Sequence, residues 1–489
     1  MKIDMSIQDW TFLIACFGLG LLAEISFFHG EIGISYPIFI IGFYLVFFIR
    51  FRLSFQHRRI GVLLMAVIWV LSGSYAIYDN ELFYLLNIVV IPLLVFFHIV
   101  LITSPKTMKW ASIPFVFSLK TKFLSGFQYL VSFGRYLFKC VFRNTNEETR
   151  QLIKRILVGL MIGFPLLFII TGLLMSADKI FEDIVLQLPN FLLRFDAWES
   201  VFRAGLVVLL TLLFFGVFQV LKPHSKEEHS LAVGDKKFRV DSITALTILV
   251  MLNAVYLLFA FIQFNYFFGQ GLQDGFTYAS YARRGFFELL FVTCINWVIL
   301  IACLKLVHNS GKTMKVILKA MYSIIILVSG VMLASAYQRL SMYEAAYGFT
   351  MDRILAHAFM IFLMIIFAYT FIRVWLEKLT LLHFYFISSL LFYTVLNAID
   401  IEQIIVNNNI ERYKDTGKID IHYLNTLSYT GVEGLMELYV LDPEYPELQT
   451  ILMDRKQQFE HNKESSWQSF NFTKQHVTEK LNEMNFINE

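Results

Sequence analysis

Four arginines lie close to the ends of apolar segments in the second half of the chain, where charged side chains are scarce. These arginines are Arg283, Arg284, Arg339 and Arg353. A guanidinium group binds phosphate or carboxylate through paired hydrogen bonds, so this set could hold an anionic headgroup or a lipid-linked phosphate. The alternative is pairing inside the protein, with Glu288, Glu344 and Asp352 or with the acidic C-terminal region, because charges in membrane proteins usually pair with one another.

Further polar residues lie in apolar segments or at the boundary between these segments and the C-terminal region. An ionisable group inside a membrane is costly and marks a functional site by default, whereas a single His or Asn commonly forms a hydrogen bond between helices. The residues for which we expect a structural or functional polar role are Glu288, Tyr343, Glu344, Tyr347, Asn397, Asp400, Asn409, Tyr413 and Asp420. No two histidines have the spacing of a metal site, so we predict no metal and no cofactor, and we assign no catalytic residue.

The composition places these residues in a membrane protein. Only 16% of the residues are charged and 57% are hydrophobic, whereas a soluble protein usually carries about 25% charged residues. A spanning helix needs about 20 mostly apolar residues. We find eleven such segments: Trp10–Phe28, Gly33–Arg50, Ile60–Tyr78, Phe83–Thr103, Ile156–Ser176, Val201–Leu221, Ile243–Phe268, Phe286–Val307, Leu318–Tyr337, Ile354–Leu376 and Leu381–Ala398. Their length and continuity exclude barrel strands and predict an all-α polytopic transmembrane helix bundle.

Basic residues collect in the connections that follow even-numbered segments. Four arginines, at 50, 52, 58 and 59, follow the second segment, and residues 104–155 after the fourth contain ten Lys and Arg but two acidic residues. The connections after the first and third segments contain no Lys or Arg. Cytoplasmic loops are the basic ones, so we expect the N-terminus inside and, with eleven spans, the C-terminus outside.

Four regions follow from this pattern. They are a four-span N-terminal part (1–103), a basic cytoplasmic or interfacial segment (104–155), a seven-span core (156–399) and a C-terminal tail (400–489). Within the basic segment, Phe115–Phe142 alternates aromatic with basic residues, which is typical of a helix that lies among the headgroups of an anionic leaflet. The alternative is an ordinary cytoplasmic loop with buried aromatic rings.

The tail is acidic. Residues 400–489 contain sixteen acidic and eight basic side chains, a net charge of −8, which leaves +11 for the rest of a chain whose total is +3. Apolar residues at helical spacing predict helices at Ile401–Tyr413, Gly431–Tyr439, Tyr445–Gln458 and Thr473–Met484. We therefore expect a small helical domain on the outer membrane face.

Five motifs follow one another in the C-terminal half: Tyr281–Phe286, Tyr343–Arg353, Asn397–Tyr413, Gly417–Ser428 and Trp467–Asn471. Together they resemble the bacterial multi-pass membrane protein family known as domain of unknown function 4173, which is related to family 4153. The resemblance implies a bacterial plasma-membrane protein with no established activity, and it supplies no catalytic residue. Where that family commonly has Asp two positions after the Asn of the last span, this chain has Ile399, followed by Asp400.

Three functions remain open. The first is a non-enzymatic cell-envelope sensor, regulator or assembly factor, whose tail binds a ligand or partner outside. The second is an envelope glycosyl- or phospho-transferase that acts on a lipid-linked anionic substrate. Its catalytic base would come from an outer loop, and those loops offer Glu31, Asp178, Glu182, Asp183, Asp196 and Glu199. The third is a transporter with a polar cavity at Asn253, Asn296 or His357.

We expect the lipid bilayer itself to be the main partner. Anionic lipids would contact the basic segment at 104–155, and an envelope lipid or protein would contact the outer face. Nothing in the sequence indicates binding to nucleic acid.

Overall fold

The computed structural model describes residues 5–52, 56–141, 147–179, 181, 197–222, 240–268, 286–307, 311–461 and 466–486, and these ranges are almost entirely helical. A helix occupies each of the eleven predicted membrane segments. These helices are α1 Ile7–Phe28, α2 Ser35–Phe51, α3 Arg58–Ile77, α4 Glu81–Thr103, α6 Glu147–Ala177, α8 Ala197–Val220, α9 Ser242–Phe268, α11 Phe286–Leu306, α12 Lys312–Tyr347, α13 Met351–Trp375 and α14 Leu381–Ala398. These helices confirm the predicted all-α polytopic membrane bundle. Helices suit a membrane because they satisfy their own backbone hydrogen bonds in lipid.

The described part of the chain contains nine helices that are long and apolar enough to cross a membrane. Two predicted spans are outside this group: α2, an apolar helix of 17 residues, and α6. The total of eleven spans therefore stays a prediction. The largest difference in length is at α12, whose 36 residues extend beyond the predicted segment at both ends.

The two largest apolar cores lie among the membrane helices. One core joins α1 to α4 with α8 and part of α14, and the other joins α9, α11, α12 and α13. Helix α14 packs against both α3 and α13, so it lies between the two groups. We call them the first and second sub-bundles.

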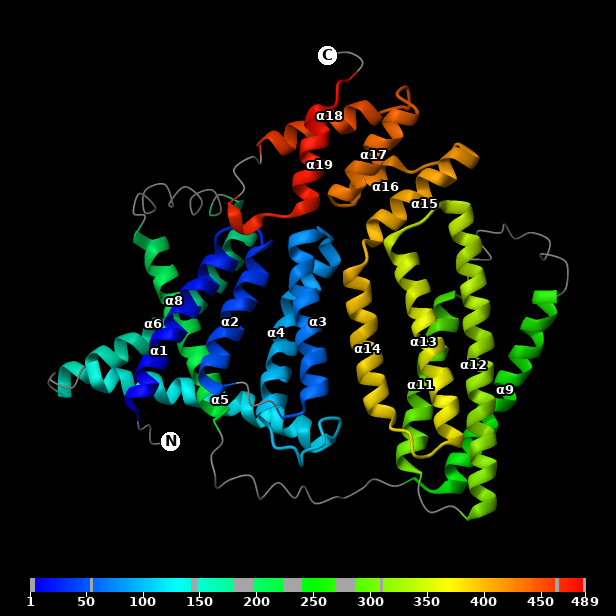
Figure 1. Cartoon of the computed structure of the whole chain (residues 1–489), viewed down its shortest axis with the longest axis horizontal. Helices are drawn as coiled ribbons and strands as arrows, with labels where there is room; N and C mark the ends of the chain where they lie inside the picture. Colours follow the sequence, from blue (N-terminus) through cyan, green and yellow to red (C-terminus); the bar gives the residue numbers. More distant parts are fainter. Residues whose placement is uncertain are drawn as a thin grey trace.

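A helix lies across the end of the bundle where the N-terminus is found. This is α5, Ile113–Val141, which runs crosswise to the membrane helices (Figure 1) and packs on α8. At the same end, Asp9 of α1 accepts hydrogen bonds from Arg50, Gln219 at 2.9 Å and Lys222 at 2.6 Å. This carboxylate therefore joins α1, α2 and the end of α8.

The tail forms a helical layer at the opposite end of the bundle (Figure 1). Its elements are α15 Ile401–Thr416, α16 Ile421–Thr426, α17 Tyr429–Leu441, α18 Leu448–His461, the short 3-10 helix η1 Trp467–Ser469 and α19 Phe472–Glu483. The four predicted tail helices are confirmed, and α16 was not predicted. The tail has an apolar core of its own around Leu424, Leu435 and Leu452.

The tail contacts the second sub-bundle through side chains that bind the main chain of the α12–α13 connection. The Nδ2 of Asn409 donates to the Phe349 carbonyl at 2.9 Å, and its Oδ1 accepts from the Phe349 amide at 3.0 Å. Arg412 donates to the Ala345 and Ala346 carbonyls. Gly348 has a φ of +86°, and a Cβ there would lie 2.6 Å from Asn409 Oδ1, so glycine is required both by the backbone and by the contact.

The tail also contacts the first sub-bundle, through η1 and the start of α19. The amides of Gly33 and Ile34 donate to the carbonyls of Gln468 and Phe470 at 2.9 and 3.0 Å. A Cβ at Gly33 would lie 2.5 Å from the Phe470 carbonyl. The tail therefore bridges the two sub-bundles at this end of the molecule.

Removing the Asn409 amide should loosen the tail. In Asn409→Ala both main-chain groups of Phe349 lose their partner, which should lower the free energy of unfolding by about 1–3 kcal/mol. Amide hydrogen exchange in α15 and at residues 349–351 should rise. The matched control is Asn408→Ala, because Asn408 is a half-buried neighbour whose amide donates within its own helix, to the Ile404 carbonyl. Equal effects of the two substitutions would contradict this docking role.

Candidate functional site

A cleft of about 610 Å3 lies between the tail and the adjoining end of the membrane bundle. Its bundle walls are the α1–α2, α3–α4 and α12–α13 connections, and its other wall is the tail. The lining residues with ionisable or amide side chains are Glu31, Tyr75, Tyr78, Asp79, Asn80, Glu81, Tyr84, Asp352, Glu402, Tyr423, Tyr429, Asn471 and Lys474. A cleft of this size between two parts of a protein is typical of a small-molecule site.

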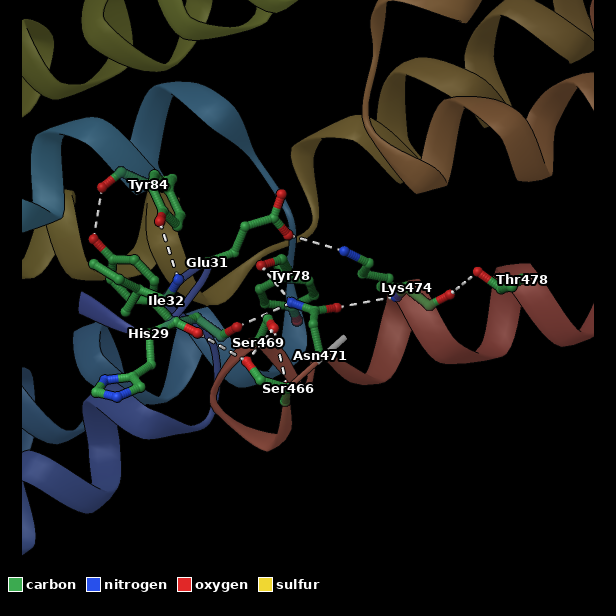
Figure 2. Close-up of polar contacts among 11 residues, drawn as sticks. His29, Glu31, Ile32, Tyr78, Tyr84, Ser466, Ser469, Asn471, Lys474 and Thr478 are labelled. Carbon is green, nitrogen blue, oxygen red and sulfur yellow. Dashed lines mark hydrogen bonds and ion pairs between the residues drawn. The ribbon is translucent and has the colours of Figure 1, made fainter. Parts of the chain in front are cut away.

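Hydrogen bonds at the start of α19 hold one side of the cleft in shape, as Figure 2 shows. The Nδ2 of Asn471 donates to the carbonyls of Tyr75 and Tyr78, both at 3.0 Å. Its Oδ1 caps α19 by accepting from the Lys474 amide at 3.0 Å. The Ile32 amide donates to the Tyr84 hydroxyl at 3.1 Å. The Asn471 side chain thereby fixes the end of α3 and the direction in which Lys474 extends from α19.

Lys474 reaches from α19 into the cleft. Its Nζ lies 2.9 Å from a carboxylate oxygen of Glu31 (Figure 2) and 5.5 Å from the centre of the Tyr429 ring. Burial alone would lower the pKa of Lys474, but the hydrogen bond and negative charge of Glu31 together with the effect of Tyr429 outweigh burial, and the pKa is raised. The lysine is therefore charged at neutral pH, held between a carboxylate and an aromatic face.

Glu402 joins three parts of the cleft wall. It is only 5% exposed, and it accepts from Asn80 Nδ2 at 2.9 Å and from the amide and hydroxyl of Ser428, the amide at 3.1 Å. Burial raises the pKa of Glu402 to about 7, against the lowering effect of Ser428, and the nearby acids Asp400 and Asp79 raise it further. This carboxyl group therefore changes its charge near neutral pH.

The cleft is acidic. Its lining contains five carboxyl groups and one ammonium group, and burial also raises the pKa of Asp79. Among the residues that the structure describes, no three His, Cys, Asp or Glu side chains are close enough together to hold a metal ion. The lining therefore suits a positively charged or hydroxyl-rich organic molecule better than an anion.

The predicted arginine site is only partly described. Arg283 and Arg284 lie outside the described residues. The Arg353 guanidinium lies 4.3 Å from the centre of the Tyr343 ring and donates to the Gly348 carbonyl. Arg339 is half-buried on α12. Binding of an anionic group by these arginines stays a prediction.

The acidic residues near these arginines have different surroundings. Glu344 is buried, and one of its oxygens lies 2.9 Å from His357 Nε2. Glu288 is exposed at the start of α11, and Tyr347 is exposed near the end of α12. The arginine that connects the tail to the bundle is Arg412, which belongs to the tail and was not among the predicted site residues.

Four other predicted polar residues form hydrogen bonds within the tail or within the bundle. Asp400 and Asp420 are the N-caps of α15 and α16, each accepting a backbone N–H at 2.9 Å. The Tyr413 hydroxyl donates to Asp442 at 2.6 Å. Asn397 accepts from Asn87 Nδ2 at 2.6 Å, which links α14 to α4.

The residues proposed for catalysis or transport have separate positions. Glu31 lines the cleft, whereas Glu182, Asp183 and Asp196 lie outside the described residues. Asn253 donates to the Met321 carbonyl at 3.0 Å and Asn296 to the Ser329 hydroxyl at 2.9 Å. These two asparagines form bonds between helices, which is the alternative to a role in transport.

Sequence reasoning missed most of the cleft. Asp79 and Glu81 stand in a short connection without basic residues, like Glu31, and this shared pattern could have indicated a common acidic surface. Glu402 is two residues after Asp400, but nothing in the sequence places it beside Asn80. No sequence pattern marks Lys474 as a site residue, because its partner Glu31 is far away along the chain.

The charge of Glu402 should make docking of the tail depend on pH. Its ordinary pKa of 4.5 rises to about 7 in the fold, so the folded state holds the proton more tightly than the unfolded chain. The stability gained is present below about pH 4.5 and is lost as the pH rises to about 7, a change of about 3 kcal/mol. Glu402→Gln should flatten this dependence in thermal unfolding of the purified protein. Parallel pH profiles for the two proteins would contradict the assignment.

Comparison with known proteins gives one match. Residues 65–438 match the model of the family described as "Domain of unknown function (DUF4153)". No curated protein and no solved structure matches the chain. Family 4173, which the sequence motifs resemble, is related to this family, and the finer assignment to 4173 stays a prediction. Because the match covers more than half of the sequence, the chain belongs to the DUF4153 family, whose function is unknown.

Proposed function

We propose that the protein is a non-enzymatic sensor or regulator of the cell envelope, which binds a small molecule in the cleft between tail and bundle. The observation that carries this proposal is the cleft itself, because its walls come from both parts. A ligand there would contact the α3–α4 connection of the first sub-bundle, the α12–α13 connection of the second, and the tail. It could therefore change how these parts sit together, provided that it binds one arrangement more tightly than another.

The alternative is an envelope enzyme, and one observation favours it. Glu31 lies in the first connection, where lipid-linked group transfer would need a carboxylate base, and it lines the same cleft as Glu402. A carboxyl group whose pKa is near 7 is well suited to proton transfer at neutral pH. We rank this alternative second because Glu402 already accepts three hydrogen bonds from the wall, which is the pattern of a structural carboxyl group.

The proposal includes an orientation and an anchor. The basic end would face the cytoplasm of a bacterial cell, and the tail would lie outside the plasma membrane. Helix α5 would rest among anionic lipids, supported by Phe123 and Phe127, which are each 65% exposed, and by the exposed Lys120. Basic amphipathic helices with exposed aromatic rings bind such surfaces.

The orientation can be tested by labelling single cysteines in a variant without the four native ones. Val440→Cys, at a tail position that is 74% exposed, should react with a membrane-impermeant maleimide in spheroplasts. Lys120→Cys on α5 should react only after the membrane is permeabilised. The reverse pattern would place the cleft in the cytoplasm.

Blocking the cleft should inactivate the protein. Thr426→Trp places an indole at the cleft wall, whereas His422→Trp adds the same group to an exposed position on the same helix, α16. In the native host, Thr426→Trp should reproduce the gene deletion and His422→Trp should behave as wild type. A sensor predicts altered transcript levels with unchanged envelope lipids, whereas accumulation of a lipid-linked precursor would favour the enzyme. Wild-type behaviour of Thr426→Trp in a stably inserted protein would overturn both.

A further inference from the structure

The protein's own chain already places an ammonium group in the cleft. Lys474 Nζ lies between Glu31, at 2.9 Å, and the Tyr429 ring, at 5.5 Å from its centre. A carboxylate beside an aromatic face is the combination that recognises organic ammonium groups. The chemistry of this subsite is therefore defined by an occupant that the structure shows, and not only by the number of acids around it.

The rest of the cleft can accept more positive charge than Lys474 brings. Asp79 lies on the α3–α4 connection, Glu81 begins α4, and Asp352 lies at the start of α13. None of these three forms a salt bridge with another residue that the structure describes. These acids lie on more than one wall of the cleft. Within the described ranges, no three His, Cys, Asp or Glu side chains are close enough together to bind a metal ion. An extended molecule with separated charges fits this arrangement better than a single metal ion.

The volume, polarity and solvent access of the cleft fit such a ligand. About 610 Å3 is space for a small organic molecule with its water. Asn80, Ser428 and Ser469 add polar groups to the lining. The Glu31 carboxylate is largely exposed, with 73% of its side chain accessible, so a competing ammonium group can reach it from solvent.

We propose that the cleft binds a small organic cation with two or more amino groups, and that one of these groups displaces Lys474 from Glu31 and Tyr429. This inference rests on the proposed function, whose ligand and mode of action it defines. Displacement releases the Lys474 side chain, which extends from α19 into the cleft. It therefore weakens one of the links between the tail and the first sub-bundle, while the ligand forms new contacts with Asp79 and Asp352.

Substituting the lysine tests the displacement. Lys474→Met keeps the length and the apolar stem but removes the competing charge, so spermidine should bind about threefold to tenfold more tightly than to wild type. The matched control is Lys480→Met on the same helix, because Lys480 pairs with Glu433 at 2.7 Å outside the cleft. Asp79→Asn should weaken binding by about fivefold or more. Binding is measured by calorimetry on the full-length protein in lipid nanodiscs at 150 mM salt, with spermidine and putrescine as probes.

Two further probes define the ligand class. 1,4-Butanediol has the length of putrescine without its charges and should not bind, and Mg2+ should not compete with spermidine at equal concentration. In wild-type protein, spermidine should also increase hydrogen exchange at the start of α19 while protecting residues 78–82 and 350–352. This measurement keeps the test valid even if Lys474→Met does not fold.

The outcomes separate this inference from the proposed function. If neither amine binds, or if Mg2+ binds equally well, the ligand class is wrong. If the amines bind but Lys474→Met does not tighten binding and exchange in α19 does not increase, the displacement is wrong. In either case the sensor role survives as long as Thr426→Trp inactivates the protein and His422→Trp does not. If the Thr426→Trp protein behaves as wild type, the proposed function fails, whether or not the amines bind.

Discussion

The arrangement of this protein depends on hydrogen bonds from tail side chains to main-chain groups at the ends of membrane helices. The last carbonyls and first amides of a helix have no partner inside the helix. Here the tail supplies partners for several of them: Arg412 for the carbonyls near the end of α12, Asn409 for Phe349, and Asn471 for the end of α3. The tail is therefore part of the membrane fold and not an independent domain on a linker.

This constraint has a consequence for the bundle. The two sub-bundles have separate apolar cores, and α14 is the membrane helix that packs between them. The tail adds a second connection, because α15 contacts α13 while η1 and α19 contact α1, α2 and α3. The tail thus contacts both sub-bundles directly, and a continuous set of packed helices is the physical requirement for the coupling that the proposed function needs.

The membrane helices could be predicted from the sequence because each is a local property of about twenty residues. The tail helices could be predicted for the same reason, since apolar residues recur at helical spacing in α15, α17, α18 and α19. The cleft could not, because Glu31, Asp79, Asp352 and Glu402 are brought together only by packing across most of the chain. Composition was also misleading in one respect. Scarce arginines drew attention to Arg353, yet the arginine that connects tail and bundle is Arg412, in a tail with ample charge.

The charge balance of the tail helps to explain why the cleft stays acidic. Burying an ion pair costs desolvation on both sides, so an interface made from amides and main-chain groups avoids that cost. Asn409, Asn471 and the η1 carbonyls form such an interface, and Lys474 with Glu31 pairs at its edge, where water still reaches the carboxylate. Docking therefore leaves Asp79, Glu81 and Asp352 without a salt bridge to any residue in the part of the chain that the structure describes. Burial raises the pKa of Asp79 and Glu402, and the organic cation that we propose would offset this cost by stabilising their ionised forms.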